Sequence, residues 1–101
     1  MRSPSSIPLY KRESVSSAFE LLPVGDIEAT CDGEPGSFFS LVQVCLEDLR
    51  RECVGLDGDC VVKVEVSTEP LEGSHVRVRV SGSAVRALPN FGPEPLPAGD
   101  Y

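Results

Sequence analysis

Two stretches of alternating apolar and polar residues dominate the chain, at residues 60–66 and 75–82. On the first, one face carries Cys60, Val62, Val64 and Val66, and the other carries Val61, Lys63, Glu65 and Ser67. On the second, valines at 76, 78 and 80 alternate with His75, Arg77, Arg79 and Ser81. A period of two is typical of a strand with one buried and one solvated face. The polar residues 68–74 between them, which include Pro70 and Gly73, predict a hairpin loop.

The hairpin register follows from matching the valines. If Val64 lies opposite Val78, Glu65 lies opposite Arg77. Such an opposite-charge pair contributes a few tenths of a kcal/mol. We therefore expect an antiparallel pair with this register.

A further strand is predicted upstream, from Phe19 to Cys31. Pro23 and Gly25 interrupt it, which is typical of an edge strand or of a bend. The residues that follow, 32–36, form an Asp-Gly-Glu-Pro-Gly sequence that predicts a turn.

A helix is predicted after this turn, because apolar residues recur there with a helical period. The apolar arc contains Phe38, Leu41, Val42, Cys45, Leu46, Leu49 and Cys53, and Val44 falls outside it. Two helix starts remain open: Ser37 as the N-cap, or Ser40 and Gln43 as a capping box. Gly55 suits the left-handed position that ends a helix.

The two ends of the chain lack such patterns. Residues 1–17 are rich in Ser and Pro, and we expect a flexible N-terminal segment in which Ile7, Leu9 and Val15 can dock on the domain. Residues 89–101 form a Pro-rich tail that we expect to be disordered, since four prolines in nine residues, 89–97, exclude a regular helix or ladder. The domain itself is expected at residues 18–88.

These elements predict an α+β fold of order β-α-β-β, with one helix on one face of a mixed sheet of three or slightly more strands. The helix would make a right-handed crossover between the first two strands, which would be parallel if adjacent. The last two strands would pair antiparallel. At 101 residues, the chain has room for one modest core.

Charge narrows the choice of partners. The chain carries 16 acidic and 9 basic residues, a formal net charge of −7. This charge repels phosphate backbones and anionic membrane surfaces, so we expect neither nucleic acid nor membrane as a partner. Residues 1–8 contain no apolar signal core, and we expect a cytoplasmic protein.

Several short motifs resemble the YbjQ-like family, often labelled a heavy-metal-binding domain. These are Leu22-Pro23-Val24-Gly25-Asp26-Ile27, Asp59-Cys60-Val61-Val62-Lys63-Val64 and Val80-Ser81-Gly82-Ser83-Ala84-Val85-Arg86. Cys60 stands at a position that is usually Ala, Ser83 replaces Thr, and the turn at 32–36 is shorter than the family's glycine-rich segment. The RcsF lipoprotein domain is similar more distantly, although its disulfide pattern does not carry over. The resemblance implies the β-α-β-β fold and ring-shaped homo-oligomers.

The four cysteines, Cys31, Cys45, Cys53 and Cys60, lack the close Cys-x2–4-Cys pairs of structural zinc sites. Cys45 and Cys53 lie on the apolar arc of the helix, and Cys60 shares a face with valines, which is typical of buried thiols. We therefore expect no metal site and no cofactor. A metal or redox role for Cys31 and Cys60, which the family label suggests, and a disulfide framework remain as alternatives.

Other candidate groups favour structural roles. His75, the only histidine, is expected to be solvated at a strand end, and Asp57 and Asp59 belong to a helix-to-strand turn, because the rest of a calcium loop is missing. The sequence contains no recognisable catalytic motif. The interpretation is a non-catalytic binding or self-assembly module, with a homo-oligomer held by strand-edge or polar contacts. A thiol-based metal-binding or redox-sensing protein is the alternative.

Overall fold

The computed structural model describes residues 3–101; residues 1 and 2 of the predicted N-terminal segment lie outside them. Three strands and one long helix form the domain: β1 (Phe19–Gly33), α1 (Phe38–Gly55), β2 (Cys60–Pro70) and β3 (Val76–Pro89). Three single-turn 3₁₀ helices accompany them, η1 (Pro4–Ser6), η2 (Pro35–Ser37) and η3 (Glu72–Ser74). The molecule is elongated along its strands, with extents of 53 × 25 × 20 Å.

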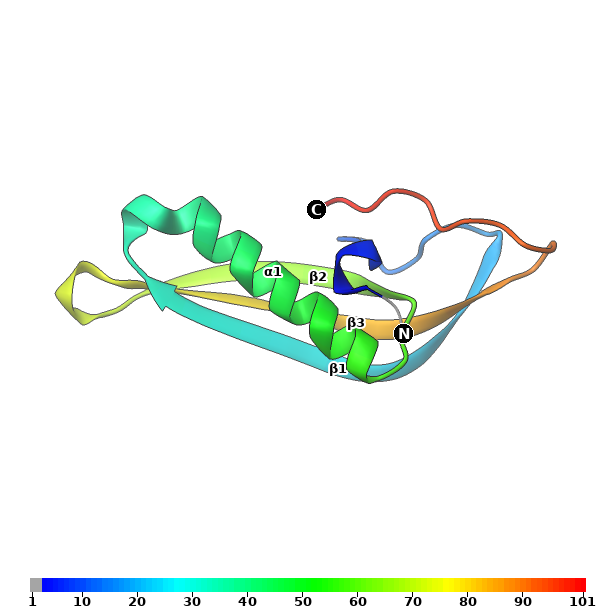
Figure 1. The fold of residues 1–101 in the computed structure, drawn as a ribbon, viewed down its shortest axis with the longest axis horizontal. Helices are drawn as coiled ribbons and strands as arrows, with labels where there is room; N and C mark the ends of the chain where they lie inside the picture. Colours follow the sequence, from blue (N-terminus) through cyan, green and yellow to red (C-terminus); the bar gives the residue numbers. More distant parts are fainter. Residues whose placement is uncertain (1–2) are drawn as a thin grey trace.

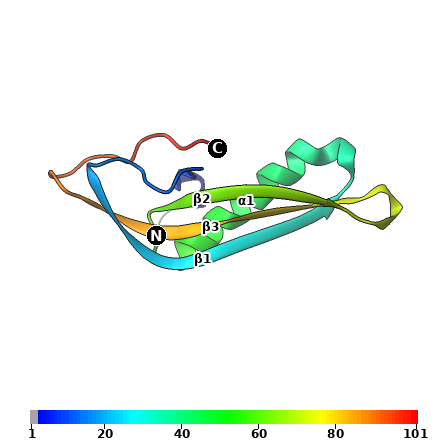
Figure 2. The same cartoon turned by 180° about the vertical axis from the view of Figure 1, so that it is seen from behind.

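The predicted α+β fold, with one helix on one face of a three-stranded sheet, is confirmed (Figures 1 and 2). The strand order is β1-β3-β2, and both pairs are antiparallel. The expectation of a mixed sheet was therefore wrong: β1 and β2 run in the same direction, but β3 lies between them. This central place suits β3, whose Val78, Val80 and Ala84 are fully buried.

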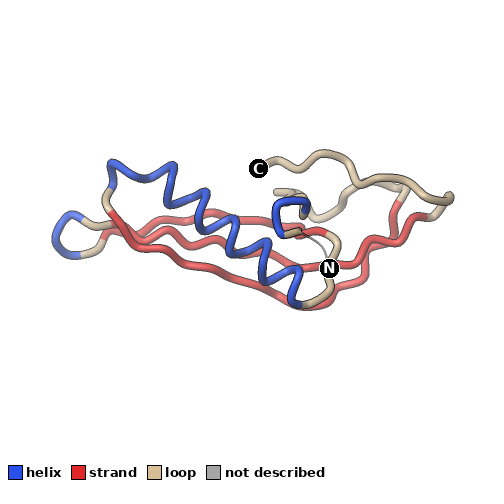
Figure 3. The backbone as a smooth tube through the Cα atoms, in the orientation of Figure 1, coloured by secondary structure: helices blue, strands red, loops and turns tan. Residues whose placement is uncertain are grey.

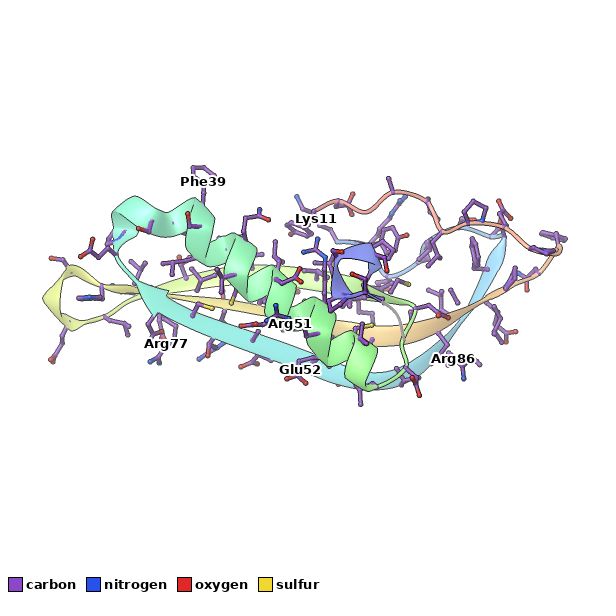
Figure 4. The ribbon with its side chains drawn as sticks, in the orientation of Figure 1. Lys11, Phe39, Arg51, Glu52, Arg77 and Arg86 are labelled. Carbon is purple, nitrogen blue, oxygen red and sulfur yellow. The ribbon has the colours of Figure 1, made fainter. Side chains whose placement is uncertain are left out.

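Helix α1 crosses one face of the sheet (Figure 3), and its predicted apolar arc is confirmed. Cys45, Leu46, Leu49 and Cys53 are fully buried, whereas Val44 is 53% exposed. Phe39, 83% exposed, points away from the sheet (Figure 4).

The structure shows where α1 begins and how it ends, which the sequence had left open. Ser37 takes the N-cap position, and Ser40 lies inside the helix. At the other end, Gly55 is the last helical residue, and Asp57 rather than Gly55 has the left-handed conformation, with φ 57°. The prediction for Gly55 was wrong because the chain turns two residues later, where the N–H of Gly58 bonds the carbonyl of Cys53.

A bulge changes which residues of β2 face the helix. Pairing with β3 shifts between Val62 and Glu65, and Lys63 within this interval has a left-handed φ of 57°. Val61 and Val64 therefore both lie in the helix-side core, while Cys60 and Val62 lie in a second cluster. The predicted face of Cys60, Val62, Val64 and Val66 was wrong for this reason.

Gly82 makes this bulge possible. A Cβ atom at Gly82 would lie 2.6 Å from Cγ1 of Val61 and 3.1 Å from the carbonyl oxygen of Val62. The bulged part of β2 therefore approaches β3 at a position without a side chain.

The hairpin register also differs from the prediction. Arg77 lies opposite Glu69, and Glu65 lies opposite Ser81. Strand β2 extends further toward the loop than expected, to Pro70, so the acidic partner of Arg77 comes four residues later in β2.

The N-terminal segment docks on the domain through Ile7, Leu9 and Val15, as expected, and also through Tyr10. Leu9 pairs with Val61 in a parallel bridge, and the amides of Val61, Lys63 and Val64 donate to carbonyls of residues 8, 12 and 10. We call Pro8–Arg12 the edge segment, since it extends the sheet beside β2. It covers the edge of β2 only near the bulge.

The tail, residues 90–101, contains no helix or strand but runs beside the edge segment (Figure 1). The hydroxyl of Tyr10 donates to the carbonyl of Pro97 at 2.5 Å, and the amide of Asp100 donates to the carbonyl of Leu9 at 2.7 Å. The predicted boundaries of the domain at 18 and 88, and the mobility of both ends, stay predictions. In the structure, both ends contact the domain.

Candidate functional site

The two cysteines considered for metal binding lie far apart. Cys31 pairs with Val78 and Cys60 with Val85 of the same strand. Seven residues of a strand span roughly 23 Å. Cys31 packs against the helix-side core, and Cys60 belongs to the second cluster. These two thiols therefore cannot bind one ion in this fold.

Cys31 has a different neighbour, Cys45 of α1. The thiol of Cys45 is fully buried and donates to the carbonyls of Ala29 at 3.3 Å and Val78 at 3.5 Å. Burial, together with a hydrogen bond and charge repulsion from Cys31, raises the pKa of Cys45 to about 12. Cys45 therefore stays a protonated core thiol, as expected, whereas Cys31 is partly accessible.

The remaining chemical candidates have structural roles. His75 is exposed at the start of β3, with Nδ1 3.1 Å from the carbonyl of Gly73, so its predicted solvated position is confirmed. Asp57 and Asp59 lie in the turn between α1 and β2, and the carboxylate of Asp59 accepts the amide of Ala87 at 2.8 Å. Among residues 3–101, no three His, Cys, Asp or Glu side chains gather as metal ligands.

A hollow of about 530 Å³ lies between the tail and the end of the sheet. Its walls include the apolar residues Phe19, Ala87 and Leu96, and its carboxylates are Asp59 and Glu94. Ser6 also lines the hollow, and its hydroxyl donates to the carbonyl of Ser3 rather than to either carboxylate.

The sheet face opposite the helix carries a network of ion pairs around Arg77 and Arg79. Arg77 contacts Asp32 at 2.7 Å and Glu69 at 3.3 Å, and Arg79 contacts Glu28 at 3.5 Å. All of these side chains are substantially exposed, as the sequence predicted for this face. Exposed pairs of this kind contribute little stability each, but they keep the face hydrated.

The outer edge of β1 is open. Within residues 3–101, β1 pairs only with β3. The amide of Asp59 donates to the carbonyl of Val85, so Val85 directs its backbone groups toward β2. By the alternation of an antiparallel ladder, Ala84, Gly82, Val80 and Val78 then bond to β1. Their partners in β1 are Gly25, Ile27, Ala29 and Cys31. The amides of Asp26, Glu28, Thr30 and Asp32 consequently point outward.

The opposite edge of the sheet is partly covered. The edge segment lies beside the bulge of β2, and its exposed side chains Lys11 and Arg12 are basic. The rest of β2, from Glu65 to Pro70, has no neighbour on its outer side within the described chain and carries Glu65 and Glu69. The edge segment was not predicted from the sequence. The apolar residues Ile7, Leu9 and Tyr10 near the start of the chain were the available signal.

Comparisons with known proteins show what this fold resembles. No family model matches the chain, and no curated protein matches it. One similar solved structure is the crystal structure of a protein of unknown function from Pediococcus pentosaceus ATCC 25745, which belongs to the DUF74 family. The two chains share 13% identity over 79% of this chain and 96% of that one, with a TM-score of 0.59. DUF74 is the YbjQ-like family, so the fold of this chain is similar to that of a YbjQ-like protein. The likeness to RcsF stays a prediction.

Within the described chain, no helix is long and apolar enough to cross a membrane.

Proposed function

We propose that this chain is a non-catalytic module of the YbjQ-like type that assembles into homo-oligomers through the outer edge of β1. The observation that carries the proposal is the row of outward amides at Asp26, Glu28, Thr30 and Asp32, which follows from the register with β3. An unpaired strand edge of this length is a template for another strand. Pro23 interrupts only the first part of the edge.

The similarity in fold to a DUF74 protein supports the membership of the YbjQ-like family that the motifs suggested. The resemblance in turn favours a homo-oligomer. The charged outer face argues for pairing at the edge rather than stacking of faces, because burying Arg77 and its partners would cost their hydration. We propose a protein partner, no enzyme activity, no cofactor, no contact with nucleic acid or membrane, and a cytoplasmic location.

A second candidate, a thiol-based redox function, is favoured by one observation. Cys31 packs against the core cluster that contains Cys45 and contributes to the raised pKa of Cys45, so the pair differs from the predicted pair of Cys31 and Cys60. The raised pKa of Cys45 makes it a poor nucleophile at neutral pH, which is why we rank this candidate second.

Multi-angle light scattering over a range of concentrations tests the first proposal. We expect a mass that is a multiple of 10.8 kDa. Thr30→Pro removes an outward donor while leaving the bonds to β3 in place, and should restore the single-chain mass. Thr30→Val keeps the amide and should assemble normally. A single-chain mass for the wild-type protein at every concentration would defeat the proposal.

A further inference from the structure

The edge segment directs two sets of backbone groups in opposite directions. Residues 8, 10 and 12 bond to β2. The backbone groups of Leu9 and Lys11 therefore point away from β2, as those of alternate residues in a strand do, while the side chain of Leu9 is buried in the core. The outer side of the edge segment is therefore a short edge at Leu9 and Lys11, in a segment that makes one bridge to β2 and bends from Lys11 onward.

The tail covers this second edge with few bonds. The amide of Asp100 donates to the carbonyl of Leu9 at 2.7 Å, and its carboxylate accepts the amide of Lys11 at 2.8 Å. Only the first of these is a bond between backbones. The Lys11 ammonium also lies 5.4 Å from the centre of the Tyr101 ring, and Figure 4 shows Lys11 beside the end of the tail.

The backbone of the tail lies so close to the backbone of Leu9 that a side chain at Gly99 would displace the tail. A Cβ atom at Gly99 would lie 2.8 Å from both the nitrogen and the oxygen of Leu9. Residues 91–95 of the tail are exposed. A continuous strand with several ladder bonds can therefore compete with the tail for this edge.

Charge indicates which strand fits. The edge segment presents Lys11 and Arg12, and the tail meets the backbone of Lys11 with the carboxylate of Asp100. The open edge of β1 carries Asp26, Glu28 and Asp32 in the same alternation; Asp32 and Glu28 also contact Arg77 and Arg79 of β3, and Asp26 accepts a hydrogen bond from Ser83. Opposite charges on adjacent strands attract. The remaining open part of β2 carries Glu65 and Glu69, and like charges would oppose its pairing with β1.

We propose that the outer edge of the edge segment is a strand-accepting surface, which the tail covers within one chain and which β1 of a second copy occupies in the assembly. This inference rests on the proposed function and names the partner of the β1 edge. The two edges belong to different surfaces, so the contact is head-to-tail and closes into a ring if the rotation permits. The tail competes with assembly.

The first experiment releases the tail in the full-length protein. Gly99→Val forces the tail away from Leu9, and Asp100→Pro removes both the amide that donates to Leu9 and the carboxylate that accepts from Lys11. Hydrogen exchange at the Lys11 amide should become faster in both, and light scattering should show association at lower protein concentration than for the wild type. Gly36→Val is the matched control, since a Cβ atom there has no neighbour within 4 Å.

The second experiment tests the partner by charge. In the Gly99→Val protein, Lys11→Glu should weaken association about tenfold, because it replaces attraction by repulsion. Arg86→Glu, at a residue labelled in Figure 4, makes the same change of net charge at an exposed position of the central strand β3, opposite Leu22 and outside the β1 residues proposed for pairing, and should leave association unchanged. Thermal melts of each variant confirm that the fold is intact.

The outcomes separate this inference from the proposed function. If Thr30→Pro abolishes assembly but neither tail release nor Lys11→Glu changes it, the inference is overturned and the proposal for the β1 edge still holds. If Gly99→Val raises the mass equally with and without Thr30→Pro, a strand other than β1 occupies the edge segment, which also overturns the inference. A single-chain mass for every variant would overturn both proposals.

Discussion

Arg77 holds Asp32 with two parallel hydrogen bonds, from Nε to Oδ1 at 2.7 Å and from a terminal nitrogen to Oδ2 at 3.0 Å. Asp32 lies directly opposite Arg77, near the end of β1 that leads to the helix. Bidentate contacts of this kind fix geometry as well as adding energy. The pair therefore ties the last residues of β1 to β3 beside the edge proposed for assembly.

This pair predicts a specific acid dependence. The hydrogen bond and charge of Arg77 hold the pKa of Asp32 below its ordinary value. A lowered pKa in the folded state adds stability above pH 4 or so, which is lost as the pH falls through the lowered value. Asp32→Asn should lower the free energy of unfolding slightly at pH 7, and the difference from wild type should vanish in acid. Urea titrations at several pH values measure it, and a difference that persists at low pH would contradict the assignment.

Gly82 should not tolerate a side chain. A Cβ atom there would lie 2.6 Å from Cγ1 of Val61 and 3.3 Å from Cγ2 of Val64. Gly82→Ala should therefore lower the free energy of unfolding by about 1–3 kcal/mol, the usual cost of overpacking. Gly36→Ala, which meets nothing within 4 Å, should change it by less than about 0.5 kcal/mol. Equal stability of the two variants in chemical denaturation would show that the bulge adapts.

Tyr10 should make stability depend on alkaline pH. Burial, with a smaller contribution from Cys60, raises the pKa of Tyr10 to about 12. A raised pKa in the folded state contributes stability that is complete below about pH 10 and is lost as the pH rises through about 12. Tyr10→Phe should lose this dependence, and it should also lower the free energy of unfolding by about 1 kcal/mol because the bond to Pro97 is lost.

Denaturation of the two proteins between pH 8 and pH 11 or so tests this expectation. Tyr101→Phe, at an exposed tyrosine, is the control and should behave as wild type. Identical alkaline profiles for Tyr10→Phe and wild type would contradict the role given to the buried hydroxyl.

The thiols should react in a definite order. Cys31 is partly exposed, whereas Cys45, Cys53 and Cys60 are fully buried. A soluble maleimide should therefore modify Cys31 first under native conditions and the other three only on unfolding. Mass spectrometry with peptide mapping gives the order, and Cys31→Ser should abolish the fast phase. Rapid modification of Cys45 in the native protein would favour the redox candidate over the assembly module.

The sequence alone determined the elements, because their signals are local. The apolar arc of α1 and the alternation of the valines around Val78 report which side of each element meets a core, and both were predicted correctly. The charged open face of Arg77 and Arg79 followed from the same alternation. The likeness to the YbjQ-like fold rested on motifs within these elements.

Tertiary structure decided how the elements meet. The place of β3 between β1 and β2, the register that pairs Arg77 with Glu69, and the bulge at Lys63 depend on hydrogen bonds between residues distant in sequence. An alternating pattern of apolar and polar residues does not reveal an extra residue in one strand. The pattern therefore predicted that Val61 lies on the polar face, whereas Val61 lies in the helix-side core. The distance between Cys31 and Cys60 also depends on strand register, because they pair with residues seven positions apart on β3.

The edge segment shows the limit most clearly. Ile7, Leu9 and Tyr10 lie among serines and prolines and have no period long enough to predict a strand. They become buried because β2 offers unpaired backbone groups at Val61 and Val64, and because the tail closes over Leu9 from the other side. The edge segment is extended only because it pairs with the edge of β2. The β2 residues to which it bonds lie more than 50 positions away in the sequence, so no local pattern predicts it.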